Sequence, residues 1–376
     1  MYSWEPSPVQ TGLLKVTLAT HDVVAERWSS MLQRSPVTVA WLSELDWGTR
    51  RLVPMVGWQL GVCGIDDVEA RLVKRELAKS MWVGRVRQAQ YARVVDGFAS
   101  AGLDVLVLKG VALGSLVYPE AGTRPSSDLD LFIGSDNYDA TMKYLRTHHL
   151  ANVSDPPRDI PQIRHSRGAV IDGLSVDIHW RLLWDRYDKG PDAEIRTRSM
   201  WFDLGDMKVR TISLEDHLLH ALVHGLRPNN LASVRWVVDT ALVIRTGEIR
   251  WDLFFEIVSA RRLGGVVSRG LQVLRDHFDV EVPAGVIDRL SNVDSRLWNR
   301  VDYWPRVHHR WRVQNYLSQY VAAYALGSWD WPMKDKVLRY PEFLGCILEA
   351  RKAQRREREG ALGRRITMPA GSEWLR

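Results

Sequence analysis

The sequence has few cysteines and no apolar segment of the length that crosses a membrane. Its two cysteines, Cys63 and Cys346, lie far apart and lack the short spacing of zinc ligands. Neither a disulfide framework nor a structural zinc site is therefore expected. A membrane helix needs roughly 20 apolar residues, and no segment provides them. The first residues also lack the basic start and apolar core of a signal peptide. We expect a cytoplasmic protein with no membrane partner.

Internal repeats, low-complexity linkers and a recognisable RNA-binding module are also missing. Hydrophobic residues make up 45% of the 376 residues and charged residues 26%, which is ordinary for a globular protein long enough for two domains. The net charge of +6 suits an anionic ligand such as a nucleotide, although charge alone does not identify one.

The most informative feature is a pair of aspartates near the middle of the chain. Asp128 and Asp130 stand two residues apart at the start of an apolar segment that predicts a strand over 129–133. Because successive strand side chains point to opposite faces, both carboxylates project from the same face. Neighbouring acids repel each other unless a cation compensates, and Mg²⁺ is commonly held by one or two carboxylates and substrate phosphates. The alternative is a surface strand with two solvated acids.

The segments on either side of this pair add two elements. Upstream, a predicted strand over 103–108 runs into Lys109-Gly110 and then a predicted helix over 110–118. A helix that begins directly after a strand and a glycine can bind an anion with its free backbone N–H groups. Downstream, Asp177 lies in a predicted strand over 174–179. If that strand pairs beside the first acidic strand, Asp177 can join the other two acids as a third metal ligand.

Five short motifs follow one another between residues 108 and 180. They are Leu108-Lys109-Gly110, Tyr118-Pro119, Arg124, Asp128-Leu129-Asp130-Leu131 and Val176-Asp177-Ile178-His179-Trp180. In this order they resemble the motifs of an uncharacterised bacterial nucleotidyltransferase family, which belongs to the polymerase-β-like nucleotidyltransferase superfamily. The resemblance is dense from about residue 100 to 182 and thinner from 211 to 245.

The resemblance implies a two-metal site for Mg²⁺, with Mn²⁺ as an alternative. It implies that Asp128 and Asp130 hold the nucleotide-bound metal, while Asp177 helps to hold the second and orients the attacking hydroxyl. Two such ions clamp the attacking and leaving oxygens of an in-line displacement. Asp128, Asp130 and Asp177 are therefore the predicted catalytic residues and metal ligands.

Further residues are predicted to bind the nucleotide. Gly110 follows the first strand, where the superfamily has the glycine turn that grips the triphosphate. Ser115 has the better spacing to the acid pair but falls inside the predicted helix, and it stays an alternative. Arg124 is expected to bind phosphate oxygens or to pair with one of the aspartates. Lys109 is expected to neutralise phosphate charge or to face water.

Serines and histidines complete the set of candidate residues. Ser127 is expected to donate a hydrogen bond to phosphate or to form a turn. His179 shares the strand face of Asp177 and could pair with an aspartate, contact the substrate or lie in the core. His220 and His224 lie one helical turn apart, which permits a zinc site, although packing of this helix over the active site is the favoured interpretation. Asp239 is expected to support His224 or Arg235.

We predict an α+β fold in which a small mixed sheet is flanked by helical regions. The expected regions are an N-terminal helical region (1–98), a nucleotidyltransferase core (99–212) and a C-terminal helical domain (213–376). The first twenty residues are expected to be partly disordered. A helix is predicted from Val68 to Phe98, and Ser213 is predicted to cap the first of several helices that continue to about residue 358. Most of the 17 tryptophans are expected to fill the core.

The predicted reaction is Mg²⁺-dependent transfer of a nucleoside monophosphate from an NTP, with ATP favoured, to a hydroxyl-bearing acceptor, with release of pyrophosphate. A small molecule, a peptide or a protein is favoured over RNA as the acceptor. Two alternatives stay open: a non-catalytic nucleotide-binding or regulatory protein of the same fold, and a kinase-like phosphotransferase. The sequence predicts neither the acceptor's identity nor the oligomeric state.

Overall fold

The computed structural model describes four stretches of the chain. They are residues 6–148, 165–183, 190–226 and 234–293. Cys346 and the helices predicted between residue 294 and about residue 358 lie outside them.

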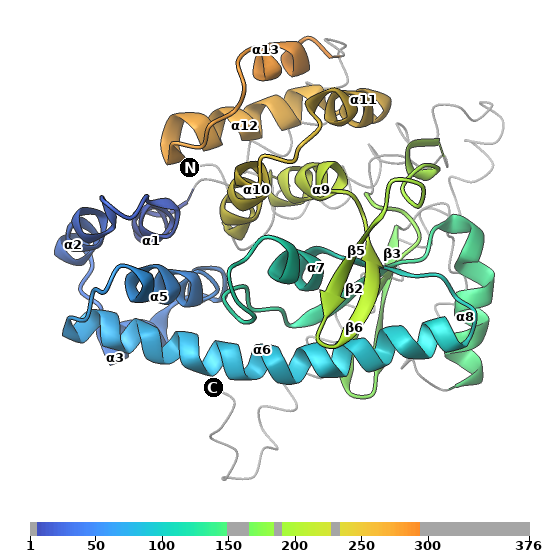
Figure 1. Ribbon diagram of the computed structural model, residues 1–376, viewed down its shortest axis with the longest axis horizontal. Coiled ribbons are helices and arrows are strands. Elements are labelled where there is room, and N and C mark those ends of the chain that lie inside the picture. The colour runs from blue at the N-terminus through green and yellow to red at the C-terminus, as the bar shows by residue number, and fades with distance from the viewer. Residues whose placement is uncertain (1–5, 149–164, 184–189, 227–233, 294–376) are drawn as a thin grey trace, which may run out of the picture.

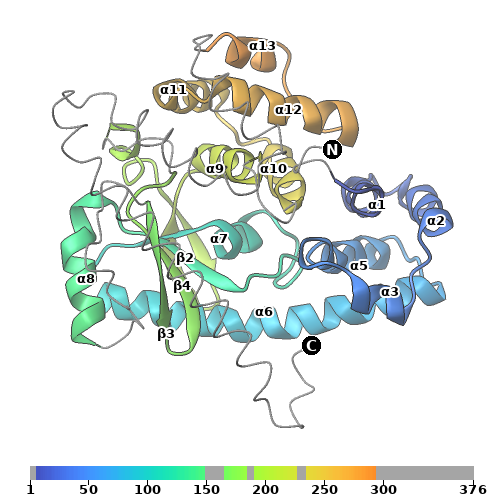
Figure 2. The ribbon, with the colours of Figure 1, turned by 180° about the vertical axis from the view of Figure 1, so that it is seen from behind.

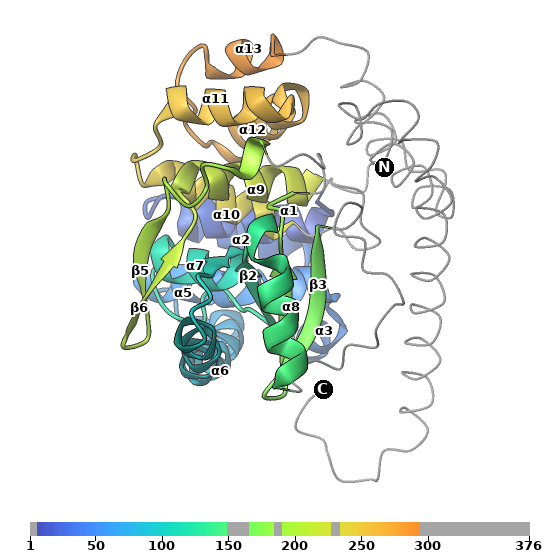
Figure 3. The same ribbon diagram turned by 90° about the vertical axis from the view of Figure 1, so that its right-hand side faces the viewer.

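One mixed sheet of six strands lies at the centre of the described residues. Its strands are β1 (Leu106–Leu108), β2 (Asp128–Phe132), β3 (Ser166–Ile171), β4 (Leu174–His179), β5 (Met200–Leu204) and β6 (Met207–Thr211). They lie in the order β3-β4-β2-β1-β6-β5, so the β5–β6 hairpin and β3 lie at opposite edges (Figure 3). β2 runs parallel to β4 and antiparallel to β1, and β1 runs parallel to β6. The predicted α+β fold with a mixed sheet is confirmed.

Local sequence explains the β3–β4 hairpin. Asp172 and Gly173 connect the two strands with φ angles of 51° and 76°. Positive φ at both central residues is what a tight two-residue hairpin turn requires, and Asp-Gly adopts it readily. The hairpin brings β4 against β2, and the register of this parallel pair places Asp130 opposite Asp177 and Phe132 opposite His179. The two strands lie side by side in the view from behind (Figure 2).

Helices surround the sheet on both sides. Those before the sheet are α1 (Pro8–Leu18), α2 (Val24–Arg34), α3 (Val39–Glu44), α4 (Trp47–Arg50), α5 (Val53–Val62) and α6 (Val68–Ser100). α6 has 33 residues and runs along the whole length of the described molecule (Figure 1). α1 makes eleven of the first twenty residues helical, and the expected partial disorder of this segment stays a prediction. Ser7 and Gln10 form a complete capping box at the start of the helix, which satisfies N–H groups that would otherwise be unpaired.

The other helices lie within and after the sheet. They are α7 (Lys109–Leu116), α8 (Tyr138–Thr147), α9 (Leu214–Leu226), α10 (Arg235–Arg245), α11 (Trp251–Arg261), α12 (Gly264–Phe278) and α13 (Val286–Ser291), with short 3₁₀ turns at Ser135–Asn137 and Gly190–Asp192. The hydroxyl of Ser213 accepts a hydrogen bond from the backbone N–H of Asp216, as the predicted cap of α9 requires. α9 to α13 lie on the side of the sheet opposite α6 (Figure 1).

The two faces of the sheet pack against different hydrophobic clusters. Leu129 and Leu131 belong to a cluster shared with the C-terminal half of α6 and with α8. Phe132 belongs to a larger cluster that joins the N-terminal helices to α9 through α13. Asp130 therefore emerges on the face of the larger cluster, as the alternation of strand side chains predicts. The larger cluster contains residues from both ends of the described chain. The predicted domain boundaries near residues 98 and 212 stay predictions.

None of the helices in the described part of the chain is both long and apolar enough to cross a bilayer.

Candidate functional site

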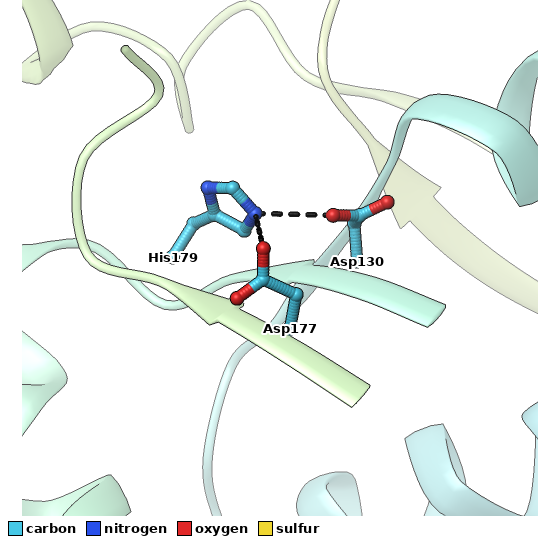
Figure 4. Close-up of side chains that lie close together, drawn as sticks. All are labelled: Asp130, Asp177 and His179. Carbon is cyan, nitrogen blue, oxygen red and sulfur yellow. Dashed lines mark hydrogen bonds and ion pairs between the residues drawn. The ribbon is translucent and has the colours of Figure 1, made fainter. Parts of the chain in front are cut away.

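Three side chains meet on the open face of β2 and β4. Asp130 and Asp177 are direct neighbours across the parallel pair, and His179 lies two residues beyond Asp177 on the same face. His179 Nε2 lies 3.1 Å from Asp130 Oδ1 and 3.0 Å from Asp177 Oδ2 (Figure 4). One ligand atom from each residue lies within 4.8 Å of the others, so the group can hold a metal ion. We call these three residues the acidic cluster.

The charges of this cluster stabilise one another. Burial raises the pKa of Asp130, but Lys109 and His179 outweigh it and hold the pKa below its usual value. Burial also raises the pKa of Asp177, but His179 outweighs burial and holds this pKa below its usual value. Burial and Lys109 lower the pKa of His179, but Asp177 and Asp130 outweigh them. The pKa of His179 is therefore raised above its usual value. The cluster thus holds two ionised carboxylates next to an imidazole that favours its proton. Metal binding through the imidazole would release that proton, because only neutral histidine is a ligand.

Lys109 supplies the nearest positive charge. It follows β1 with a φ of 49°, a conformation that few residues other than glycine adopt. Its Nζ lies 2.5 Å from Asp130 Oδ1 and 3.2 Å from His179 Nε2. The structure therefore directs Lys109 to the acidic cluster, whereas the sequence led us to expect phosphate or water as its neighbour. The positive φ of Lys109 and its contact with Asp130 occur together at the end of the strand.

Asp128 lies apart from the acidic cluster. It is the first residue of β2 and is paired with Ser175, two positions along β4 from Asp177. A strand advances about 3.3 Å per residue, so its Cα atom lies roughly 6–7 Å along the strand from that of Asp130. Ser127 Oγ donates a hydrogen bond of 3.4 Å to the carboxylate of Asp128. Asp128 still borders the same cavity as the other two acids, and its role as a ligand stays a prediction.

Gly110 and Ser115 take different positions on α7. Gly110 borders the cavity, and a Cβ atom at this position would collide with the guanidinium of Arg124 and the hydroxyl of Ser126. Only glycine lets these side chains approach the helix start so closely. Ser115 lies against α6, where its hydroxyl is 3.5 Å from Gln88 Nε2.

The acidic cluster opens onto a cavity of about 350 Å³. Asp128, Asp130 and Asp177 border it from the sheet, and Lys109 and Gly110 border it from α7. Its other walls come from the N-terminal helices, α9 and α10. They include Trp47, Arg51, His217, His220, His224, Arg235, Trp236 and Asp239.

Arg124 pairs with Asp239 across this cavity. Its Nε and Nη2 donate hydrogen bonds of 2.7 Å to the two carboxylate oxygens, and Tyr118 donates a third to Oδ1 at 2.7 Å. Asp239 is thus the partner of Arg124, whereas the sequence pointed to His224 or Arg235. Burial opposes the charge on each member, but the pair lowers the pKa of Asp239 and raises that of Arg124. The third nitrogen of Arg124, Nη1, is buried and has no hydrogen-bond partner in the part of the chain that the structure describes.

The histidines of α9 border the same cavity. His220 and His224 stack with ring centroids 5.4 Å apart. His217 Nε2 lies 2.9 Å from the hydroxyl of Thr211, which in turn donates to the carbonyl of Val107. Burial, with a contribution from Arg124, lowers the pKa of His217 to about 3, so this side chain is neutral at pH 7. α9 therefore packs over the cavity, as the favoured interpretation of its histidines expected.

Two further arginines border the cavity: Arg51 was not predicted, and Arg235 was expected only as a possible partner of Asp239. Arg51 follows α4, and Arg235 begins α10. Both donate hydrogen bonds to the carbonyl of Pro125, at 3.4 Å from Arg51 Nη2 and 2.5 Å from Arg235 Nη1. The Arg51 guanidinium also lies 3.9 Å from the ring centroid of Trp47. No local pattern signals these contacts, because 74 and 110 residues separate the partners.

Comparison with known proteins gives one match. A family model described as an uncharacterised nucleotidyltransferase matches residues 48–279, which is more than half of the chain. The matched range includes residues of all three predicted regions, both cavity arginines and the whole acidic cluster. No curated protein and no solved structure matches the chain.

Proposed function

This chain belongs to the uncharacterised nucleotidyltransferase family, and on that premise we propose that it transfers a nucleoside monophosphate from an NTP to a hydroxyl-bearing acceptor. The observation that carries the proposal is the pairing of Asp130 with Asp177 in register on neighbouring parallel strands, beside a cavity of about 350 Å³. Two ionised carboxylates at the wall of such a cavity suit a divalent cation that also binds phosphate oxygens.

The donor atoms fit Mg²⁺, and they also fit Mn²⁺. Asp130 and Asp177 offer hard oxygen ligands, and His179 offers a nitrogen in the same group. Asp128, on the wall of the same cavity, is proposed as a further ligand of the nucleotide-bound metal. When bound, the metal neutralises the triphosphate and stabilises the charge that develops on the leaving pyrophosphate.

The residues of the chain are proposed to position the reactants. Asp177 is half-buried and faces the cavity, so its carboxylate can orient the acceptor hydroxyl. The hydroxyl oxygen forms a bond to the α-phosphorus, the bond from that phosphorus to the bridging oxygen breaks, and pyrophosphate leaves. The hydroxyl proton passes to water. The start of α7 at Gly110, with Ser127 nearby, is proposed to contact the phosphates. Positioning of this kind contributes a large part of the rate in such displacements.

ATP is the proposed donor, and a small molecule, a peptide or a protein is favoured over RNA as the acceptor. The same site could in principle direct attack at the γ-phosphorus, or bind a nucleotide without turnover. These outcomes differ in which phosphate is transferred.

The test uses ATP labelled at the α- or the γ-phosphate. The full-length protein is incubated with Mg²⁺, a mixture of candidate acceptors and each labelled nucleotide in turn. Transfer of the α-label to an acceptor or to the protein itself, together with formation of pyrophosphate, supports the proposal. Transfer of the γ-label would instead identify a phosphotransferase. Binding of ATP with neither label transferred would identify a non-catalytic nucleotide-binding protein.

A further inference from the structure

Three arginines from distant parts of the chain meet at one wall of the cavity. Arg51 comes from the N-terminal helices, Arg124 precedes β2 and Arg235 begins α10. Arg51 and Arg235 donate to the same carbonyl, that of Pro125, so their guanidinium groups lie close together. We call these three side chains the arginine cluster.

The arginine cluster carries more positive charge than its surroundings balance. Asp239 is its only ion-pair partner among the residues that the structure describes, and both its oxygens are engaged by Arg124. Burial lowers the pKa of Arg235 to about 9, and repulsion from Arg124 and Arg51 contributes. Burial and Arg124 lower the pKa of Arg51 to about 10, although Asp128 and Asp239 oppose them. Buried charges of one sign are costly unless a ligand of opposite sign compensates them.

One nitrogen of this cluster is an unpaired donor behind the cavity wall. Arg124 is 7% exposed, and its Nη1 is buried with no hydrogen-bond partner among the described residues. This nitrogen lies against Gly110, because a Cβ atom there would collide with it. Gly110 belongs to the first turn of α7, whose backbone N–H groups have no partners within the helix. Two kinds of donor, guanidinium and backbone amide, therefore converge on one part of the cavity.

The arginine cluster lies near the proposed metal site. Gly110 follows Lys109, whose ammonium contacts Asp130. An anion held between Gly110 and the arginines would therefore lie next to the acidic cluster. A single carboxylate would balance only one charge, whereas a pyrophosphoryl group carries several and accepts the paired hydrogen bonds that guanidinium offers.

We propose that Arg51, Arg124 and Arg235 bind the β- and γ-phosphates of the nucleotide, so that the helices before and after the sheet complete the nucleotide site. This inference rests on the proposed function, since the ligand is the tail of the donor nucleotide. In this arrangement Arg51 and Arg235 donate to the pyrophosphoryl group together with the first turn of α7, and Arg124 Nη1 gains the partner that it lacks.

The experiment measures binding by calorimetry with three probes: ATP, AMP and inorganic tripolyphosphate. The variants are Arg51→Gln and Arg235→Gln. Arg85→Gln, which removes an exposed arginine of α6 outside the cavity, is the control of equal charge. Arg124 is left intact because its loss would strand Asp239 in the interior. Each cavity variant is expected to bind ATP and tripolyphosphate about 10- to 100-fold more weakly, the usual effect of losing a charged hydrogen bond. AMP affinity and the control are expected to be unchanged.

Arg51→Lys distinguishes weaker phosphate binding from a loss of the fold, because it keeps the charge and loses only the paired hydrogen bonds. It is expected to bind tripolyphosphate with an affinity between those of the wild type and Arg51→Gln. Equal weakening of ATP and AMP, unchanged ATP affinity in both glutamine variants, or no tripolyphosphate binding by the wild type would each overturn the inference.

The outcomes also separate this inference from the proposed function. Label transfer from ATP by the wild type, with an unchanged KM for ATP in Arg51→Gln and Arg235→Gln, would overturn the arginine assignment alone. Selective loss of tripolyphosphate binding in these variants, with no label transfer by the wild type, would instead support the phosphate subsite and overturn nucleotidyl transfer.

Discussion

The acidic cluster and the arginine cluster border one cavity, but only the charges of the acidic cluster are balanced by neighbouring side chains. In the acidic cluster, Asp130 and Asp177 are matched by Lys109 and His179. In the arginine cluster, one carboxylate, Asp239, stands against three cations (Arg51, Arg124 and Arg235). In the acidic cluster, a metal ion can take over the charge of Lys109 and His179. The charge of the arginine cluster is balanced only when an external anion binds. A nucleotide bound to a metal would satisfy both at once.

This comparison also separates two buried carboxylates by their roles. Asp130 and Asp239 are both buried, and each contacts a cation. Asp130 faces the proposed metal, whereas Asp239 is enclosed by Arg124 and Tyr118. We therefore expect the first to be needed for activity and the second for stability.

The largest expected effect is the loss of activity in Asp130→Asn or Asp177→Asn. Each change removes an anionic ligand of the proposed metal, and kcat is expected to fall on the order of 10³-fold or more. Circular dichroism should show an unchanged fold. Asp96→Asn, at an exposed position on α6, is the matched control and should keep full activity. Turnover close to the wild-type rate in either cavity variant would contradict the metal assignment.

Asp239→Asn tests the other half of the comparison. It leaves the buried guanidinium of Arg124 without its charged partner and weakens the hydrogen bond from Tyr118. Breaking a buried ion pair in this way typically costs about 3–5 kcal/mol in the free energy of unfolding. Chemical denaturation should show this loss, both with and without Mg²⁺. Equal stability of Asp239→Asn and the wild type would mean that the pair does not hold α10 against the sheet.

Lys109→Met tests whether the acidic cluster balances its own charge. Without the ammonium, the two carboxylates keep only His179 as a cationic neighbour, and the metal-free protein should lose about 3 kcal/mol of stability. Saturating Mn²⁺ should restore much of this loss, since the metal takes over the charge of the ammonium. Lys208→Met, which removes an exposed lysine paired with Asp203, provides the comparison. If Mn²⁺ stabilises Lys109→Met no more than the wild type, a metal ion does not take over the charge of the Lys109 ammonium.

The smallest expected effect concerns the pH dependence of His217. Its pKa is lowered to about 3 in the folded protein by burial and by Arg124, whereas an unfolded histidine titrates near 6.5. The unfolded state therefore binds the proton more readily, so stability falls as pH drops below about 6.5. At pH 5 this contribution amounts to ~2 kcal/mol relative to pH 7.5.

His217→Gln removes that titration while keeping an N–H donor for Thr211. The difference in unfolding free energy between pH 7.5 and pH 5 should therefore be smaller in the variant than in the wild type. An identical pH dependence in the two proteins would contradict the burial of His217 as a neutral side chain.

The sequence predicted the acidic cluster better than the arginine cluster because of how each is built. Strand alternation and the Asp172-Gly173 turn are local signals, and they predicted the strands that carry Asp130 and Asp177. The register between those strands is not local, since it joins residues 47 positions apart along the chain. It places Asp177 opposite Asp130, two positions from the partner of Asp128, which the sequence could not show.

The assembly of the arginine cluster has no local signal, although Arg124 alone was predicted. Arg51 and Arg235 meet at Pro125 only after helices from both ends of the described chain pack against the sheet. The orientation of Lys109 was equally hidden, because it occurs together with a positive φ at a residue other than glycine. Arg124 was predicted as a phosphate ligand from its position, but its partner Asp239 lies 115 residues away.

The central claim is that Asp130 and Asp177 hold a divalent cation together, and a Mn²⁺ titration followed by electron paramagnetic resonance tests it most directly. The wild-type protein without nucleotide is predicted to reduce the free Mn²⁺ signal, and Asp177→Asn is predicted to lose most of that binding while Asp96→Asn keeps it. Binding of Mn²⁺ to Asp177→Asn as tight as to the wild type would contradict the account.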